Sequence, residues 1–413
     1  MKVILALLIL LAGYAVPGYA EDHYQLEKVV EISRHGIRAP TPGNRKEIEA
    51  ATQRPWPRWH TADGELTAHG YAAVVNKGRW QGEHYRQLGL LAPGCPGAQQ
   101  IYVRASPLQR TRATADALVT GAFAGCKVTI HYATDDKDPL FQSEKFAFAQ
   151  LDPANEHAAI AAKAGDLAAL QQGLQPAIQQ LKQAVCASDC PLFDRPWQLK
   201  QTKGGSTYVL GLSVMASMAE TLRLGWNEHL PSPQLAWGNI TSSAQISALL
   251  PLLTANYDLS NDVGYIAQKR GSILLDAVVK SLRDSPDTPH TRWLLLVAHD
   301  TNIAMVRTLM QFNWQLPGYP RGNIPPGSSL VFERWRDNQT GTRFLRIYFQ
   351  AQSLDELRLL TPITDQHPLL QQEWQQKNCR STSVGVLCPD QSTLQQFSAA
   401  MDSHALSTVN YPE

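Results

Sequence analysis

Six short runs rich in β-branched residues, with helical stretches between them, are the feature that most constrains the fold of this chain. The runs cover residues 26–32, 101–103, 128–132, 293–298, 329–332 and 344–349. Helical patterns fill residues 71–90 and 301–310, and in the second stretch Ile303, Val306 and Leu309 recur at helical spacing. Strands that alternate with helices predict an α/β fold, with a mixed central sheet flanked by helices.

The middle of the chain has a different pattern. Residues 155–185 are rich in Ala, Gln and Leu, residues 210–224 form another apolar helical stretch, and strand signals are sparse from 136 to 262. We therefore expect residues 136–262 to be a mostly α-helical inserted cap domain that lies over one end of the sheet. Residues 21–135 and 263–413 then form the α/β domain, and from about residue 352 the pattern predicts helix and loop.

The first residues have the three parts of a secretory signal peptide. Met1 and Lys2 give a positive start, residues 3–12 are apolar, and the small residues Gly18 and Ala20 flank a cleavage point. The apolar run is too short to span a bilayer comfortably, and no stop-transfer pattern follows it, which disfavours an uncleaved anchor. We expect residues 1–20 to be removed and the mature protein to be periplasmic or secreted, with no membrane span.

Charge and cysteine content exclude several classes of protein. The formal net charge is +1, which provides no global basic surface for nucleic acid. Six cysteines in an exported chain indicate disulfides, with fifteen possible pairings. Pairing of nearest neighbours is the simplest of these and gives Cys95–Cys126, Cys186–Cys190 and Cys379–Cys388. No pair has zinc-ligand spacing, so we expect no metal site.

The first predicted strand runs directly into a cationic turn. Its end reads Ser-Arg-His-Gly-Ile-Arg-Ala-Pro-Thr, residues 33–41. Arg34, His35 and Arg38 repel one another unless an anion lies between them, and guanidinium groups match phosphate oxygens in a bidentate way. Gly36 would let the backbone approach a ligand closely, and ligands bind at the carboxyl ends of strands in open α/β sheets. A solvated basic turn is the alternative for these residues taken alone.

Two later segments favour an anion site. The predicted strand at 293–298 delivers His299 and Asp300 to the start of a helix, a position that suits oxyanion binding and proton donation. Arg110 also follows a strand and opens a helix. Each segment alone is a weak signal, because a His-Asp pair after a strand is more often a structural cap and arginines at helix starts are common.

Taken together, the three segments resemble the histidine acid phosphatase family, a branch of the phosphoglycerate-mutase-like superfamily. The family motifs Arg-His-Gly-x-Arg-x-Pro and a late His-Asp match residues 34–40 and 299–300. Residues 66–70 resemble its Leu-Thr-x-x-Gly motif and residues 109–111 its third arginine motif, and the likeness extends to the cysteine pairs and residues 325–327. It covers nearly the whole mature chain and is nearest to enterobacterial periplasmic phytases and glucose-1-phosphatases.

The resemblance implies a phosphomonoesterase that needs neither metal nor cofactor. His35 is the expected catalytic nucleophile, because a neutral imidazole can attack phosphorus and form a phosphohistidine. Asp300 is expected to protonate the departing alkoxide and then to help water attack the intermediate. The groups expected to bind the non-bridging oxygens are Arg34, Arg38, Arg110 and His299.

The resemblance also implies three further substrate contacts, by Thr41, Glu220 and Arg270. The Thr41 hydroxyl is expected to reach the phosphate, while Glu220 and Arg270 face the rest of the pocket. An exposed helix position is the alternative for Glu220, and a solvated charge run is the alternative for Arg270.

One departure from the family pattern bears on the substrate. Several phytases of the family carry a lysine where this chain has Pro42, and Arg45 and Lys46 are the nearby candidates to replace its charge. We expect hydrolysis of phytate (myo-inositol hexakisphosphate), with a periplasmic glucose-1-phosphatase of the same chemistry as the nearest alternative. Export disfavours a phosphotransferase or mutase, and a non-catalytic organic-phosphate-binding protein has no need of Asp300. The expected partner is a small phosphomonoester, and the expected state is a monomer.

Overall fold

The computed structural model describes residues 23–412, so the predicted signal peptide at residues 1–20 lies outside the described residues. Within residues 23–412, nine strands form one sheet and two more form a separate hairpin. The strands are β1 (Tyr24–Arg34), β2 (Ile101–Ala105), β3 (Ile130–His131), β4 (Gln198–Gln201), β5 (Thr207–Leu210), β6 (Trp293–Ala298), β7 (Ser329–Asp337), β8 (Arg343–Ala351), β9 (Leu370–Glu373), β10 (Arg380–Thr382) and β11 (Gly385–Pro389).

The α-helices of the same range cover both faces of the sheet and one of its ends. They are α1 (Pro42–Thr52), α2 (Ala68–Gln87), α3 (Gln109–Ala122), α4 (Pro153–Ala164), α5 (Leu167–Gly173), α6 (Gln175–Val185), α7 (Leu212–Asn227), α8 (Ser243–Asp258), α9 (Gly264–Leu282), α10 (Asp300–Met310), α11 (Leu354–Leu359) and α12 (Asp390–Ala400). Among the described residues, no helix has the length and apolar character needed to cross a membrane.

The central strand β1 gives the sheet its mixed character. The order across the sheet is β10-β11-β8-β7-β1-β6-β2-β3, with β9 paired to β8. β1, β6, β2 and β3 run parallel, whereas β7 pairs antiparallel with both β1 and β8. The predicted mixed sheet is therefore confirmed. The carboxyl ends of β1, β6 and β2 meet at one edge of it, which is where ligands bind in such sheets.

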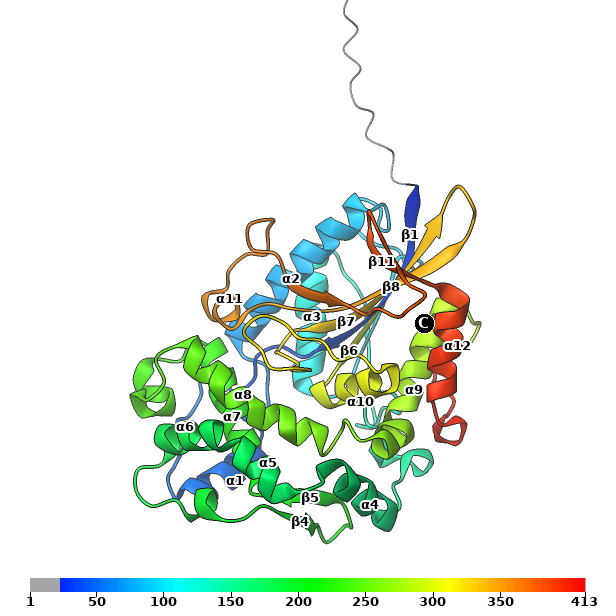
Figure 1. Ribbon diagram of the computed structural model, residues 1–413. Coiled ribbons are helices and arrows are strands. Elements are labelled where there is room, and N and C mark those ends of the chain that lie inside the picture. Colours follow the sequence, from blue (N-terminus) through cyan, green and yellow to red (C-terminus); the bar gives the residue numbers. More distant parts are fainter. Residues whose placement is uncertain (1–22, 413) are drawn as a thin grey trace, which may run out of the picture.

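Alternate residues of the parallel strands pack against two different helical layers. Val29 of β1 and Leu295 of β6 belong to an apolar cluster with residues of α2 and α3, while Val30 and Leu294 belong to another with residues of α9 and α10. Figure 1 shows α2 and α3 on one side of the sheet and α9, α10 and α12 on the other. Because both faces are covered, β6 is apolar at every position instead of alternating with polar residues.

The predicted helical insertion contains α4 to α8 and the short β4–β5 hairpin. Figure 1 shows these helices, coloured green, grouped at the carboxyl end of β1. Their buried apolar side chains belong to the same cluster as those of α9 and α10. The division of the chain into residues 136–262 and a surrounding α/β domain stays a prediction.

The end of the chain contains strands where the sequence pattern predicted helix and loop. β9 and β11 pair with β8, and β10 pairs with β11, so these strands extend the sheet on one side. The prediction was wrong here because β9 and β10 read Leu-Gln-Gln-Glu and Arg-Ser-Thr. Such short polar strands are ordered by pairing with a neighbour, and their own residues carry no strand signal.

Three disulfides join neighbouring cysteines along the chain, as predicted. They are Cys95–Cys126, Cys186–Cys190 and Cys379–Cys388. Disulfides of this kind are typical of proteins in an oxidising compartment. Within residues 23–412, no group of three or more His, Cys, Asp and Glu side chains is arranged to hold a metal ion.

Candidate active site

The cationic turn of the first motif lies where β1 ends. The His35 N–H donates to the Ala298 carbonyl of β6 at 3.1 Å, and the Arg34 N–H donates to the Ser328 carbonyl at 2.8 Å. The Gly327 N–H in turn donates to the His35 carbonyl at 3.0 Å. The turn is thus held from both sides, and His35 is only 1% exposed.

Close packing against α2 explains the glycine of this turn. A Cβ built at Gly36 would lie 2.9 Å from both Leu66 Cδ1 and Val74 Cγ2, which is closer than real side chains approach. The Gly36 N–H also donates to Thr114 Oγ1 at 2.9 Å. The glycine lets the turn fit against its neighbours, whereas the sequence suggested close approach of a ligand as its reason.

The His35 ring has one nitrogen available for chemistry. Its Nδ1 lies 2.8 Å from the Gly36 carbonyl oxygen, and because a carbonyl only accepts, Nδ1 carries the proton. In the neutral ring Nε2 therefore holds an unshared electron pair. Burial, together with the positive charges of Arg34 and Arg110, keeps the pKa of His35 well below its usual value. The ring therefore stays neutral in mild acid.

The Arg34 guanidinium is held in place by two carboxylates of the protein. Its guanidinium is fully buried, with Nη2 at 2.5 Å from Glu220 Oε1 and 3.3 Å from Asp300 Oδ2. Its Nη1 donates to the Ile324 carbonyl at 2.6 Å. Glu220, supplied by α7, also forms an ion pair with Arg223 on the next turn. Burial would raise the pKa of Glu220, but Arg223 and Arg34 lower it, so the group is ionised.

Glu220 is a buried residue of the cluster. The residue is 5% exposed, so the alternative of an exposed helix position is wrong. Its carboxylate is engaged by two arginines, and its contact with a substrate stays a prediction.

Arg38 and Arg110 have no such carboxylate partners. Within residues 23–412 neither forms an ion pair, and their guanidinium bonds run to the backbone carbonyls of Ala39 at 2.9 Å and Gly64 at 3.3 Å. Burial and the charge of Arg38 lower the pKa of Arg110 to about 10, which still leaves it charged in acid. A buried cation such as Arg38 is costly without a counter-charge, and a bound anion would compensate both Arg38 and the partly buried Arg110.

His299 faces His35 across the site. The centroids of the two rings are 5.6 Å apart. His299 Nε2 lies 2.9 Å from Oγ of Ser106, the residue that follows β2. The His299 N–H donates to Asn302 Oδ1 at 3.1 Å, which fixes the start of α10. Burial and the nearby Arg110 lower the pKa of His299 to about 3, so this ring is also neutral in mild acid.

Both oxygens of Asp300 accept hydrogen bonds. Oδ1 accepts from the Thr301 N–H at 3.0 Å, and Oδ2 accepts from the hydroxyl of Tyr257 on α8. Burial would raise the pKa of Asp300, but Arg34 and the Tyr257 hydroxyl outweigh it and hold the pKa below its ordinary range. The group is therefore a carboxylate until a negative charge reaches the site.

Thr41 and Arg45, at the start of α1, both have structural partners. Thr41 Oγ1 accepts from the Asn44 N–H at 3.2 Å and caps the helix, so its phosphate contact stays a prediction. Arg45 donates to both oxygens of Asp63, at 2.6 and 2.8 Å. That pairing compensates the charge of Arg45, whereas Lys46 is exposed. Replacement of the missing lysine by either residue stays a prediction.

Arg270 shares a cavity with two of the predicted site residues. The cavity measures about 330 Å³, and its lining includes Arg110, His299 and Arg270, with Glu144 and Asn261 near them. In the part of the chain that the structure describes, the Arg270 side chain forms no ion pair, and its Nε is buried without a hydrogen-bond partner. A cation that is free to bind an anion therefore lies beside the cluster around His35.

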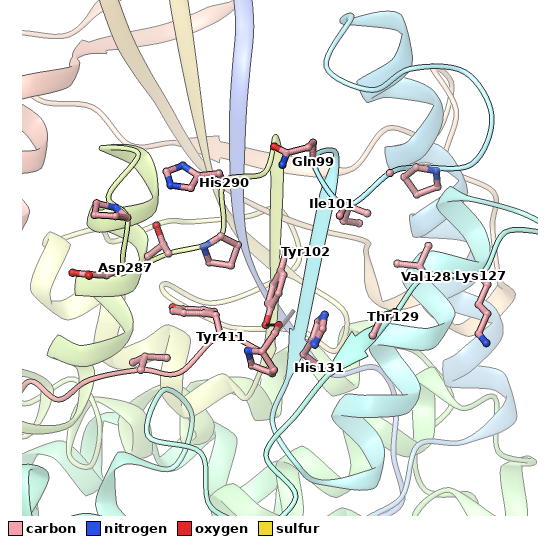
Figure 2. A pocket seen from close by; sticks show the side chains of 18 residues that line it. Gln99, Ile101, Tyr102, Lys127, Val128, Thr129, His131, Asp287, His290 and Tyr411 are labelled. Atoms are coloured by element: carbon pink, nitrogen blue, oxygen red, sulfur yellow. Dashed lines mark hydrogen bonds between the residues drawn. The ribbon is translucent and has the colours of Figure 1, made fainter.

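A larger cavity, of about 780 Å³, lies at the opposite end of β2. Figure 2 shows its lining, which includes Tyr102 at the start of that strand, His131 on β3 and His290 in the loop before β6. The His131 ring stacks on Tyr102 with centroids 4.3 Å apart, and neither histidine forms an ion pair with a carboxylate of residues 23–412. The lining of this cavity includes none of the arginines around His35, and neither His35 nor Asp300.

Two residues of the cluster were not identified from the sequence. Ser106 follows β2 and Tyr257 ends α8, and each contacts an expected site residue. Position after a strand was a usable signal for Ser106, as it was for Arg110. No local signal marks Tyr257, because its contact depends on how the helical region docks against α10.

Comparison with known proteins agrees with this arrangement. The model of the histidine phosphatase superfamily (branch 2) matches residues 25–350, a range that holds every residue of the cluster. The chain belongs to this superfamily. Within the superfamily it is 31% identical to phytase AppA of Escherichia coli over 93% of this chain and 94% of that protein. It is 30% identical to a glucose-1-phosphatase of Salmonella typhimurium, over 93% of this chain and 94% of that protein.

Solved structures of superfamily members share the fold across nearly the whole chain. The Klebsiella sp. ASR1 phytase superposes with a TM-score of 0.92 and 64% identity, covering 94% of this chain and all of that one (100%). The Hafnia alvei phytase in complex with myo-inositol hexakis sulphate gives a TM-score of 0.83 at 30% identity, covering 94% of this chain and 99% of that one.

Proposed function

We propose that this chain is a phosphomonoesterase that hydrolyses phytate through a phosphohistidine on His35. One observation carries the proposal. The neutral His35 ring, with Nε2 unshared, lies among guanidinium groups, and two of these, on Arg38 and Arg110, have no carboxylate partner in residues 23–412. A nucleophilic imidazole that is surrounded by guanidinium groups, two of them without a carboxylate partner, is suited to the transfer of a phosphoryl group.

In the first half-reaction, His35 Nε2 attacks phosphorus in line with the ester oxygen. A P–N bond forms as the ester P–O bond breaks, and the departing alkoxide takes a proton from Asp300. The charge on the non-bridging oxygens is stabilised without metal by groups already in place. These groups are Arg34, Arg38, Arg110 and His299.

The phosphate itself prepares Asp300 for this step. Its negative charge offsets the arginines that lower the pKa of Asp300, so the carboxyl takes up a proton in the complex. In the second half-reaction, water attacks phosphorus and gives a proton to the Asp300 carboxylate. The P–N bond breaks, and inorganic phosphate leaves with His35 neutral again.

The cavity beside the cluster favours a substrate with several phosphates. Arg270 lies there together with Arg110, and its guanidinium has no ion pair within the described residues. A sugar monophosphate carries its charge on one group and gives Arg270 no partner, whereas an inositol polyphosphate supplies further anions. The related Hafnia alvei enzyme accommodates a hexasulphate of inositol, which supports the same reading for this chain.

Glucose-1-phosphate is the second candidate substrate, because a glucose-1-phosphatase is 30% identical to this chain, close to the 31% of phytase AppA. The chemistry at His35 would be identical for both substrates. We propose further that the enzyme acts in the periplasm or outside the cell, which is supported by the three disulfides. That it acts as a monomer is part of the proposal.

A substrate panel tests the proposal. Phosphate release from phytate and from glucose-1-phosphate is measured at pH 4–5, with and without a chelator. We expect kcat/KM for phytate to exceed that for glucose-1-phosphate by at least about tenfold, and the chelator to have no effect. A preference for glucose-1-phosphate would overturn the phytate assignment.

A matched variant separates catalysis from binding. Asp300→Asn should bind phosphate but lose about 10²- to 10⁴-fold in turnover of phytate, the usual contribution of a general acid. A wild-type protein that binds phytate and never releases phosphate would instead be an organic-phosphate-binding protein.

A further inference from the structure

Tyr257 contacts Asp300 from a distant part of the chain. It lies in the last turn of α8, 43 residues before Asp300, and its hydroxyl bonds to Asp300 Oδ2. A carboxylate has no proton to give, so the phenol is the donor while Asp300 is ionised. Tyr257 is 4% exposed, so water does not compete freely for this bond.

Two contacts tie the end of α8 to α10, the helix that Asp300 begins. The Asp262 N–H donates to the Tyr257 carbonyl at 2.8 Å and closes the turn after α8. The Asp262 side chain then accepts from Arg307 at 3.3 Å and from Thr308 at 2.5 Å, both on α10. The phenol and the carboxyl are therefore held by elements that are clamped together.

The other groups around Asp300 cannot take the place of this hydroxyl. The charged and titratable groups that face Asp300 are Arg34, Arg38, Arg110, His299, Glu220 and Tyr257. The arginines stay charged at every working pH, Glu220 is paired with arginines, and His299 is neutral in mild acid. Among residues 23–412, Tyr257 gives Asp300 its one hydrogen bond from a side-chain hydroxyl.

We propose that Tyr257 is a positioning residue for Asp300, which orients the carboxyl and favours its ionised form in both half-reactions. The inference rests on the proposed function, since it concerns the acid of that reaction. When Asp300 gives its proton to the alkoxide, the carboxylate that results accepts the Tyr257 O–H bond. The phenol keeps its own proton throughout, so it supplies orientation and charge stabilisation and takes no part in the transfer.

The test is the alkaline limb of the kcat profile in Tyr257→Phe, because kcat reports groups as they titrate in the enzyme–substrate complex, where Asp300 takes up its proton. Without the donor, the carboxylate is less stable and Asp300 keeps its proton to higher pH. With phytate, whose alkoxide leaving group needs that proton, we expect the limb to move up by about one pH unit, the usual effect of a hydrogen bond to a charged group. With p-nitrophenyl phosphate, whose leaving group needs no proton, the limb should stay in place.

Tyr319→Phe is the matched control. Tyr319 is also 4% exposed, and its hydroxyl donates to the Gln352 carbonyl at 2.8 Å, away from Asp300. This variant loses an equally buried tyrosine hydroxyl and should keep the wild-type limb. A second variant carries 3-fluorotyrosine at position 257, whose more acidic phenol is a stronger donor and should move the phytate limb downward. If Tyr257→Phe does not fold, the 3-fluorotyrosine variant alone tests the proposal.

Three outcomes separate the positioning role of Tyr257 from the proposed function on which it rests. Opposite shifts in the two Tyr257 variants support the positioning role. A phytate limb that stays in place in a folded Tyr257 variant, or that moves equally in Tyr319→Phe, overturns it. If the wild type releases phosphate from neither phytate nor p-nitrophenyl phosphate, the proposed function itself fails, which is a separate result from an unshifted limb.

Discussion

The protonation state of His35 is set by its surroundings and not by the imidazole alone. The ring is buried at the end of β1, and Arg34, Arg38 and Arg110 place positive charge around it. Both effects disfavour an imidazolium, so the pKa of His35 falls well below the usual 6.5. The proposed nucleophile, which must be neutral to attack phosphorus, is therefore available at a pH where an exposed histidine would be protonated.

This environment predicts activity that persists into acid. Since the pKa of His35 is lowered, the neutral nucleophile stays populated as the pH falls through 6.5. We expect kcat/KM for p-nitrophenyl phosphate to change by less than about threefold between pH 6 and pH 4, whereas a nucleophile with pKa 6.5 would lose roughly 80-fold. His404→Gln, at a side chain that is 90% exposed, is the control and should leave the profile unchanged. A fall of tens of fold in the wild type would contradict the prediction.

The residues around His35 were predictable from strand ends together with the family resemblance. His299 and Arg110 each follow a strand, and parallel neighbours end at the same edge of a sheet, so the resemblance that joined the three segments also fits their place near His35. The role of Glu220 was not accessible in this way. It lies 186 residues from Arg34, on a helix whose docking depends on many distant contacts, and its position in the sequence does not show which side of the arginine it occupies.

At the scale of elements, one buried ion pair connects a helix to the strands that form the site. Lys77 of α2 donates to Glu31 Oε1 of β1 at 3.1 Å and to the Gly327 carbonyl at 2.9 Å. Glu31 is 0% exposed and also accepts from Gln81 Nε2 at 2.9 Å. Since Gly327 donates to the His35 carbonyl, this pair braces the segments on either side of the catalytic turn.

Removing one partner of this pair should be much worse than removing both. In Lys77→Met, Glu31 is left buried without a counter-charge, and we expect the free energy of unfolding to fall by about 3–5 kcal/mol. In the double variant Lys77→Met/Glu31→Gln the uncompensated charge is absent, so the loss should be smaller than in the single variant. Urea denaturation of wild type, both single variants and the double variant gives the coupling energy. Additive losses would show that the two side chains act independently.

Elements were predicted well where their own residues determine them. β6 coincides with its predicted range, because a strand buried on both faces is apolar along its whole length. β9 and β10 escaped prediction because their polar residues gain order from the strand beside them. The β4–β5 hairpin was not predicted for the same reason, because its first strand reads Gln-Leu-Lys-Gln.

At the scale of the whole molecule, two of the three disulfides reinforce two different regions. Cys95 and Cys126 lie after α2 and α3, the two helices that cover one face of the sheet. Cys186 and Cys190 lie directly after α6, among the helices at the carboxyl end of the sheet. The first disulfide closes a segment of 31 residues and the second a segment of 4.

Loop length should therefore rank the two disulfides. A cross-link stabilises a fold chiefly by restricting the unfolded chain, more so for a longer loop, which gives about 3–4 kcal/mol for Cys95–Cys126 and about 2 kcal/mol for Cys186–Cys190. We expect Cys95→Ser/Cys126→Ser to lower the urea midpoint by more than Cys186→Ser/Cys190→Ser does. Similar slopes in the two denaturation curves would exclude a change in the unfolding transition itself. The reverse order would mean that packing of the helices around Cys190, which is 2% exposed, outweighs loop closure.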